Sequence, residues 1–243
     1  MSSSADGGCE KRASQGPVSK ASRDCPRCPR LVAFREAWRA RQPSWHNAPV
    51  PSFGPVSARL LIVGLAPGLQ GANRTGRPFT GDYAGDLLYA TLSRFGFSTG
   101  TFAARPDDGL ALHDTRITNA VRCVPPENKP VGTEIKECRD FLKATIAEMP
   151  NLAAVVALGR IAHDSTVVAL GRRMSALPFG HGATHPVDGL TLFDSYHCSR
   201  YNTNTGVLTP EMFHAVFAAV RCYLDARSQA TTTAALSSGG NTG

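Results

Sequence analysis

Residues 59–68 read RLLIVGLAPG, and this stretch decides the class of fold. Its run of Leu, Ile and Val lacks the apolar–polar alternation of a strand with one face in water, so it predicts a parallel strand covered by helices on both faces. The run ends in GLAPG (64–68), where glycine and proline predict a turn at the carboxyl end of the strand. The turn contains no charged side chain, so any charged group that it serves must come from elsewhere in the chain.

Three further apolar runs predict strands of the same kind: TRITNAV (115–121), AAVVALG (153–159) and LTLFDSYH (190–197). Helical patterns alternate with these strands, at residues 83–96, 132–149, 159–170 and 209–227. Such alternation predicts a three-layer α/β/α fold with a central, mostly parallel four-stranded sheet and right-handed crossovers.

The two ends of the chain differ in composition from the middle. Residues 1–23 are rich in Ser, Gly and basic residues, and residues 228–243 carry no charge and little apolar bulk. Neither segment can bury enough surface to offset its ordering entropy, so both are predicted to be disordered tails of one domain at 24–227. No apolar stretch approaches the roughly 20 residues of a membrane span, and no signal-peptide core is evident. We therefore expect a soluble, cytoplasmic protein without a membrane partner.

The formal net charge is +7, and 21 of the 26 basic residues are arginine. A basic chain of ordinary composition needs no special partner, since net charge also serves solubility. The planar fork of arginine matches phosphate, so a phosphate-rich partner such as DNA is the alternative interpretation.

The seven cysteines are odd in number and no export signal precedes them, which argues against a disulfide framework. Cys25 and Cys28 form a C-x₂-C pair, and fourteen residues separate Cys123 from Cys138. Two such pairs fit a Cys₄ site for Zn²⁺ or for an iron–sulfur cluster, and the spacing does not choose between them. The other three cysteines are isolated: Cys9, Cys198 and Cys222.

An open α/β sheet binds its ligand at the carboxyl ends of its strands, so polar residues there are candidates for a site. Asp82 precedes a predicted helix, where its local sequence predicts an N-cap, and where it could also orient a water molecule. Phe79 is a core residue by default or a stacking platform. Asn119 makes a turn or reads a base edge. His197 is structural, or it opens a donor-rich loop suited to phosphate.

Four motifs together resemble the B-type (family 5) uracil-DNA glycosylases of bacteria and archaea over residues 25–225. They are GLAPG, NRTGRPFTGD, TNAVRC with PPENKP, and HCSRYNTNTG followed by LT. The resemblance implies a structural [4Fe–4S] cluster, whose ligands would be Cys25, Cys28, Cys123 and Cys138. It also implies a role for each site residue. Asp82 and His197 would be catalytic. The base would contact Ala66, Gly68, Phe79 and Asn119, and the DNA would contact Ser199, Arg200 and Asn202.

The implied reaction is hydrolysis of the bond between deoxyribose and a damaged base that has left the helix. Uracil is the implied base, with hypoxanthine or ethenocytosine as further substrates, in single- or double-stranded DNA, and the enzyme is expected to act as a monomer. In this chain Cys198 stands where the family usually has proline, which predicts a more flexible loop. Two other hypotheses remain: a non-catalytic iron–sulfur DNA-binding or sensor protein, and a nucleotide-binding α/β enzyme. The second lacks both the P-loop and the G-x-G-x-x-G spacing.

Overall fold

The computed structural model describes residues 19–238, with side chains to residue 230, and contains a five-stranded sheet of order β4-β1-β5-β7-β6. The strands are β1 Leu60–Gly64, β4 Thr115–Asn119, β5 Ala154–Leu158, β6 Thr184–Val187 and β7 Leu190–Ser195. The four predicted strands are present and parallel. The predicted count of four was wrong by one, because β6 pairs antiparallel with β7 at the edge of the sheet. Pro186 hid this strand from the sequence pattern, since proline is tolerated in strands only at such edges.

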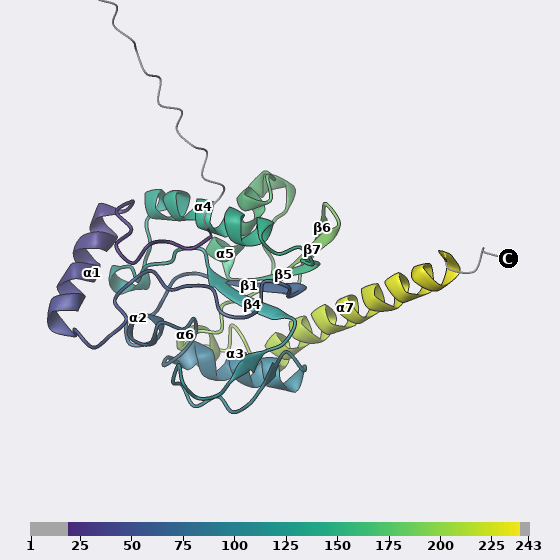
Figure 1. Ribbon diagram of the computed structural model, residues 1–243, viewed down its shortest axis with the longest axis horizontal. Helices are drawn as coiled ribbons and strands as arrows, with labels where there is room; N and C mark the ends of the chain where they lie inside the picture. Colours follow the sequence, from purple (N-terminus) through teal and green to yellow (C-terminus); the bar gives the residue numbers. More distant parts are fainter. Residues whose placement is uncertain (1–18, 239–243) are drawn as a thin grey trace, which may run out of the picture.

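Helices cover both faces of the sheet, which confirms the three-layer fold (Figure 1). They are α1 Pro29–Arg41, α2 Ala72–Thr75, α3 Tyr83–Arg94, α4 Gly132–Ala147, α5 Arg160–Ala169, α6 Arg200–Asn204 and α7 Pro210–Ser238. Two 3₁₀ turns, Pro126–Asn128 and Met174–Ala176, and a small ribbon of β2 Ser98–Thr99 with β3 Ala111–Leu112 complete the described structure. Helices α4 and α5 lie on one face, and α3 and α7 lie on the other.

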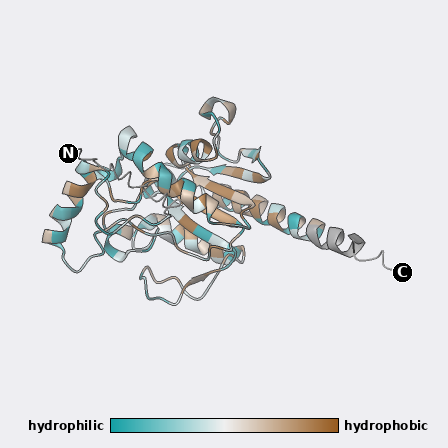
Figure 2. Ribbon diagram, turned by 45° about the horizontal axis from the view of Figure 1, so that its top comes forward, coloured by the Kyte–Doolittle hydropathy of each residue, from teal (hydrophilic) through white to brown (hydrophobic). Residues whose placement is uncertain are grey.

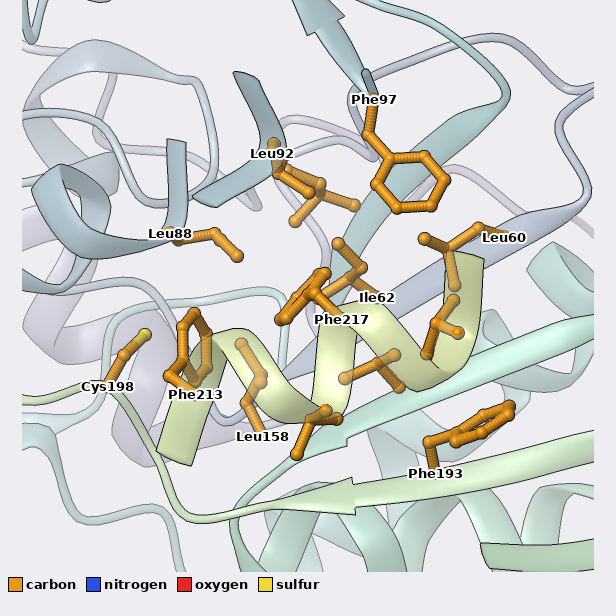
Figure 3. Packing of buried hydrophobic residues seen from close by; sticks show 14 of the residues in the cluster. Leu60, Ile62, Leu88, Leu92, Phe97, Leu158, Phe193, Cys198, Phe213 and Phe217 are labelled. Carbon is orange, nitrogen blue, oxygen red and sulfur yellow. The ribbon is translucent and has the colours of Figure 1, made fainter. Parts of the chain in front are cut away.

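Strand β1 shows why the opening run is apolar throughout. Leu60 and Ile62 belong to the core cluster under α3 and α7, and Leu61 and Val63 belong to the cluster under α4 and α5. All four are fully buried, as alternate residues of a strand must be when both faces are covered. Figure 3 shows Ile62 meeting α7 residues such as Phe217, and Figure 2 shows the hydrophobic residues gathered along the sheet.

Helix α1 was not predicted from the sequence. Only Leu31 and Arg35 of its residues are buried, so it has little of the amphipathic pattern that reveals a surface helix. Pro29 at its first position favours the start of a helix, and Arg39 donates from its Nε to the Asn47 carbonyl at 2.9 Å. Polar contacts of this kind help to hold α1 against the rest of the domain, and they leave no periodic pattern in the sequence.

The C-terminal helix is longer than predicted. The sequence indicates a helix end at residue 227, but α7 continues to Ser238, so the predicted end was wrong. The expected disorder from residue 228 stays a prediction. Figure 1 shows the last turns projecting from the body of the molecule. Continuation of a formed helix costs less than nucleation, so it needs no apolar periodicity that would show in the sequence. Residues 1–18 and 239–243 of the expected tails lie outside the described residues. None of the helices described is long and apolar enough to cross a membrane.

Candidate active site

The carboxyl ends of β1, β4 and β7 face a cavity of about 550 Å³. Most residues predicted for the site line it: Ala66, Gly68, Phe79, Asp82, Asn119, His197, Ser199 and Arg200. These residues come from four motifs that are far apart in the sequence. The topology of the parallel sheet brings them to one edge, as the rule for open α/β sheets predicts.

Asp82 combines the two interpretations that its sequence allows. It is the N-cap of α3, where its Oδ1 accepts a hydrogen bond from the Gly85 amide at 3.3 Å, and it also lines the cavity. The charge-free turn makes room for it. A Cβ on Gly68 would lie 2.8 Å from Asp82 Oδ2, and a Cβ on Gly71 would lie 2.3 Å from the same oxygen. The glycine-rich turn has no carboxylate of its own, and its glycines allow its backbone to lie close to the Asp82 carboxylate.

The surroundings of Asp82 act on its pKa in opposite directions. Burial raises the pKa of this carboxyl, and the negative charge of Asp86 raises it further. Hydrogen bonds from the Gly85 and Ala84 amides lower the pKa, but by less than the other effects raise it. The net pKa of Asp82 therefore lies above its ordinary value. The carboxylate is thus poorly hydrated and held by fixed dipoles, the setting in which a charge acts most strongly on a developing cation.

Phe79 has a backbone conformation that a bulky residue rarely adopts, with φ of 53°. Its carbonyl passes so close to Gly85 that a Cβ there would lie 1.9 Å from the oxygen. Its ring leaves no room for a side chain on Gly64, where a Cβ would meet Phe79 Cζ at 2.6 Å. The ring lies 6.0 Å from the His197 ring at an interplanar angle of 27°. Strain of this kind persists where the surrounding structure fixes a functional geometry.

The anchor of the Phe79 loop is Arg77, which the sequence analysis did not identify. Its guanidinium makes a bidentate, buried ion pair with Asp108 at 2.8 and 2.7 Å. Arg77 Nε also donates to Thr80 Oγ1 at 2.7 Å. The hydrogen bond from Arg77 holds the pKa of the Asp108 carboxyl well below its usual range. Asp108 lies 31 residues away in a loop without a motif, so no local signal reveals the pair.

Asn119 ends β4 directly beside Gly64 of β1. Its residue surface is only 3% exposed, and its Oδ1 has no hydrogen-bond partner among the described residues. A Cβ on Gly64 would lie 2.4 Å from this oxygen, so glycine is required beside it. A buried amide oxygen that lines a cavity without a partner costs free energy unless a ligand donates to it.

His197 follows β7 and lies against the N-terminus of α5. Burial lowers the pKa of His197 to about 4, so the imidazole is neutral at physiological pH. Gly159 lies beside His197, because a Cβ on it would be in ordinary contact with His197 Cβ at 3.4 Å, and its φ of +90° favours glycine. A neutral imidazole in a cavity is a hydrogen-bond donor that does not bring its own charge.

The loop after His197 forms the rim of the cavity. Ser199 caps α6 by accepting from the Asn202 amide at 3.4 Å, and the Arg200 guanidinium lies 5.2 Å from the centre of the Tyr83 ring. Asn202 does not line the cavity. Its Nδ2 donates to the His197 carbonyl at 2.8 Å and so holds the loop. Tyr83 and Asn128 line the cavity although the sequence did not single them out; Tyr83 directly follows the NRTGRPFTGD motif, and Asn128 lies within PPENKP.

Cys198 points away from the cavity into the core beside Phe213 (Figure 3). The side chain is fully buried, and its thiol donates to the Ala84 carbonyl at 3.4 Å. Burial, with the charge of Asp82 as a smaller contribution, raises the pKa of this thiol well above its ordinary value. It is therefore an unreactive thiol that joins the rim loop to the N-terminus of α3. Greater flexibility of that loop stays a prediction.

The four cysteines of the predicted metal site lie together around a small cavity: Cys25, Cys28, Cys123 and Cys138. All four are free thiols. Burial, with the neighbouring cysteines adding to it, raises the pKa of Cys28 to about 11 and that of Cys123 to about 12. Four clustered thiols gain most from a bound cationic group, which favours the thiolate form.

Two buried cations lie beside these thiols. The Arg122 amide donates to Cys138 Sγ at 3.3 Å, and Arg35 Nη1 donates to Cys123 Sγ at 3.9 Å. The Arg122 guanidinium donates to the hydroxyls of Ser52 and Thr145. No carboxylate within the described part of the chain pairs with it at ion-pair distance. A buried guanidinium of this kind is compensated by a negative group nearby, as a thiolate-bound cluster would be.

Comparison with known proteins identifies the family. Residues 51–221 match the Uracil DNA glycosylase superfamily. A type-5 uracil-DNA glycosylase of Thermus thermophilus is 47% identical over 196 residues, which cover 78% of this chain and 89% of that protein. Type-5 uracil-DNA glycosylases of Pyrobaculum aerophilum and Mycobacterium bovis are 40% and 42% identical, over 77% and 79% of this chain and 84% and 75% of their own lengths.

The similarity spans nearly the whole described domain, and the expected residues of separate motifs lie in one cavity. The chain belongs to the uracil-DNA glycosylase superfamily, among its type-5 members.

Proposed function

We propose that this protein is a monofunctional DNA glycosylase that hydrolyses the N-glycosidic bond of uracil in DNA and leaves an abasic site. The observation that carries the proposal is one cavity in which Asp82, Asn119 and His197 converge. The names of its type-5 relatives support the same activity. A carboxylate, an unpaired amide oxygen and a neutral imidazole are the groups that this reaction requires.

Asn119 provides the recognition of the base. The edge of uracil presents an N–H donor flanked by two carbonyl acceptors. The unpaired Oδ1 of Asn119 would accept from the N–H, and its Nδ2 would donate to one carbonyl. The Phe79 ring at the wall of the cavity offers a surface on which the everted base can stack. A base without this N–H would leave the buried Asn119 Oδ1 with no hydrogen bond, so the site should discriminate strongly against such bases.

The reaction separates charge between the sugar and the base. Asp82 would stabilise the positive charge that develops on the sugar and orient the attacking water. His197 would donate a hydrogen bond to the oxygen of the departing base, and its low pKa keeps it from protonating the base in advance. Each such preorganised group contributes about 10²–10³ in rate in comparable sites.

The size of the cavity supports a broader substrate range. About 550 Å³ is much more than a single pyrimidine occupies, and the lining is largely apolar apart from the groups named above. We therefore extend the proposal to hypoxanthine, which keeps an N–H donor beside a carbonyl, and to ethenocytosine, which lacks that donor and should be released more slowly than uracil. The DNA would contact the rim through Ser199 and Arg200, with the basic surface of the protein contributing affinity in both single- and double-stranded substrates.

The four cysteines fit a [4Fe–4S] cluster, and we propose one, held by Cys25, Cys28, Cys123 and Cys138. A single Zn²⁺ with bonds of about 2.3 Å would bring its sulfur ligands within about 3.8 Å of one another. Within residues 19–230, no three thiols lie within 4.8 Å of one another. The wider spacing and the two buried arginines favour the larger, anionic group. When bound, the cluster supplies a rigid link between the chain segments of its ligands, and the chemical step needs no redox reaction.

A substrate panel tests the proposal. The purified protein is incubated with single- and double-stranded oligonucleotides that carry uracil, hypoxanthine or ethenocytosine, and abasic sites are revealed by alkaline cleavage. We expect release of uracil by the wild type and release slowed by about 10²–10³ or more in Asp82→Asn, which should still bind the oligonucleotide. Binding without release by the wild type would contradict the proposal and favour a non-catalytic DNA-binding protein.

A further inference from the structure

A second cluster of titratable side chains lies outside the cavity, on the other side of β7. His163 of α5, His185 of β6 and Asp194 of β7 bring their ligand atoms within 4.8 Å of one another, and they form the sole such group among the described residues. The side chains of His163 and Asp194 are completely buried, and that of His185 is 11% exposed. None of these residues lines the active-site cavity.

The distances favour a proton over a metal ion in this cluster. His163 Nδ1 lies 2.7 Å from Asp194 Oδ1, and His185 Nε2 lies 3.1 Å from Asp194 Oδ2. Two ligands of a tetrahedral zinc ion with bonds of 2.0–2.1 Å would lie about 3.3 Å apart. A separation of 2.7 Å is that of a charge-assisted hydrogen bond. Asp194 also accepts from the Gly180 amide at 3.3 Å.

The two ring nitrogens of His163 both face acceptors. Nδ1 faces the Asp194 carboxylate, and Nε2 lies 2.7 Å from the Leu177 carbonyl. A neutral imidazole has one N–H, so one of these contacts would place two lone pairs against each other. The imidazolium donates to both. The structure therefore assigns a buried His163⁺–Asp194⁻ ion pair that joins α5, β7 and the loop at Leu177.

This ion pair lies one helical turn from the active site. The His163 amide donates to the Gly159 carbonyl at 3.0 Å, and the Gly159 amide donates to the Ser195 carbonyl at 2.7 Å. Gly159 is also the residue against which His197 Cβ packs. The ion pair and the contact of Gly159 with Ser195 thus fasten the N-terminus of α5 to the end of β7, immediately before His197.

The loop that His163 holds makes a second contact with the same segment. His181 Nδ1 accepts from the Tyr196 amide at 3.1 Å, and its ring stacks on the Tyr196 ring at 4.9 Å. The Gly182 amide donates to the Asp194 carbonyl at 2.9 Å. Residues 194–196 are therefore held from two sides, by α5, which carries His163, and by the loop whose Leu177 carbonyl faces His163 Nε2.

We propose that His163 and Asp194 are positioning residues that place the His197 imidazole against the departing base. The inference rests on the proposed function, because it concerns the geometry of the proposed catalytic site. Neither residue touches the substrate. Each acts through the backbone of residues 195–197, and displacement of a catalytic group by about 1 Å can cost about 10²-fold in rate.

The charges around His163 give the pair a pH dependence. Burial lowers the pKa of His163, and the hydrogen bond and charge of Asp194 outweigh it, so the net pKa is raised. Asp164 on the same helix adds negative charge, His185 faces Asp194 from β6, and the Arg160 guanidinium lies 5.4 Å from the centre of the neighbouring Phe179 ring. The ion pair is therefore complete at low pH and is lost as pH rises through the raised pKa of His163. Base release should decline as pH rises through that pKa.

The test compares His163→Gln with His185→Gln. Both variants remove a histidine that contacts the Asp194 carboxylate. Only the His163 side chain also contacts the Leu177 carbonyl, and so links α5 to that loop. We measure the single-turnover rate of uracil release, the Kd for uracil-containing DNA, and the pH profile of the rate. We expect His163→Gln to lose about tenfold or more in rate with a Kd within about twofold of wild type, and to lose the decline with rising pH. His185→Gln should retain that decline.

Other outcomes would overturn the inference. A His163→Gln protein with the wild-type rate and pH profile would do so while leaving the proposed function intact, whereas a wild type that releases no uracil would remove the function itself. If His163→Gln does not fold, ¹⁵N NMR of the wild-type histidines decides. Protons on both ring nitrogens of His163 at neutral pH support the ion pair, and a single proton contradicts it. Stoichiometric zinc that Asp194→Asn loses would show a metal in place of the proton.

Discussion

Asp82 shows that a capping residue and a residue of the proposed catalytic site can be the same side chain. Its carboxylate accepts the amide of Gly85 and lies within contact distance of the backbone at Gly68 and Gly71. Hydrogen bonds from the amides at the helix N-terminus favour the ionised form, although burial works against its charge. A site of this kind stores free energy, because the folded protein holds a charge where water would solvate it better.

Replacement of Asp82 by Asn should therefore have opposite effects on activity and stability. The raised pKa of the folded carboxyl means that the ionised form opposes folding above the unfolded pKa, so its neutral isostere should raise the Tm. Base release should fall by about 10²–10³ or more. Calorimetry and a single-turnover assay measure the two effects. A variant with lowered Tm and near-normal release would contradict both parts.

A substitution at Gly71 tests whether the turn lacks a side chain at this position in order to leave room for the Asp82 carboxylate. A Cβ at this position would lie 2.3 Å from Asp82 Oδ2 and 3.0 Å from Asp82 Cβ, so Gly71→Ala must displace the side chain. We expect a loss of at least about tenfold in release, since small displacements of a catalytic group are costly. Gly132→Ala is the control, because nothing lies within 4 Å of its Cβ position. Equal activity of the two variants would show that the turn has another purpose.

At the scale of elements, the segment before α1 and the segment between β4 and α4 contact each other through the cysteines. Arg30 of α1 makes a bidentate ion pair with Glu134 of α4 at 2.8 Å for both bonds, and Arg27 lies 4.7 Å from the centre of the Phe141 ring. The side chain of Arg30 is well exposed, so this pair alone contributes little. A group bound by the cysteines, as proposed above, would add to the contacts that anchor α1.

Cys138→Ser should prevent binding of the cluster and so weaken the attachment of α1 to the domain. We expect loss of bound iron and of visible absorption, with a fall in Tm of about 4–8 °C, equivalent to roughly 2 kcal/mol for a chain of this size. Cys222→Ser is the matched control, because Cys222 is an exposed free thiol. Iron analysis, absorption spectra and thermal unfolding check the outcome. A wild type with one zinc and no iron would contradict the cluster.

At the scale of the whole molecule, we expect the net charge of +7 and the exposed rim of the cavity to determine how DNA is held. Arg200 is exposed at the rim, where its guanidinium lies over Tyr83. Phosphate contacts release counterions, so their number appears in the salt dependence of binding rather than in any one structure.

Binding of undamaged DNA should weaken steeply with salt, and Arg200→Ala should reduce the slope of log K against log salt concentration by about 1. Arg105→Ala is the control, as a strongly exposed arginine away from the cavity lining. Fluorescence anisotropy over a range of salt concentrations measures the slopes. An unchanged slope for Arg200→Ala would place this residue outside the phosphate contacts.

Much of the fold is local information and was predictable. The strands β1, β4, β5 and β7 are buried on both faces, and the amphipathic helices between them have marked ends. Strand β6 and helix α1 were missed because an edge strand with Pro186 and a helix with a mostly exposed surface carry no periodic signal. Helix α7 outlasted its predicted end because helical continuation needs no tertiary contact.

The sequence by itself determined the three-layer fold, the family resemblance and most of the residues that line the cavity, since these depend on residue types at fixed spacings along the chain. Only the tertiary structure decided the burial, the hydrogen bonding and the pKa of those residues. The raised pKa of Asp82, the unpaired Oδ1 of Asn119, the Arg77–Asp108 clamp and the buried His163–Asp194 pair all arise from contacts between distant segments. Burial and hydrogen bonding act through space, and a sequence pattern records only neighbours along the chain.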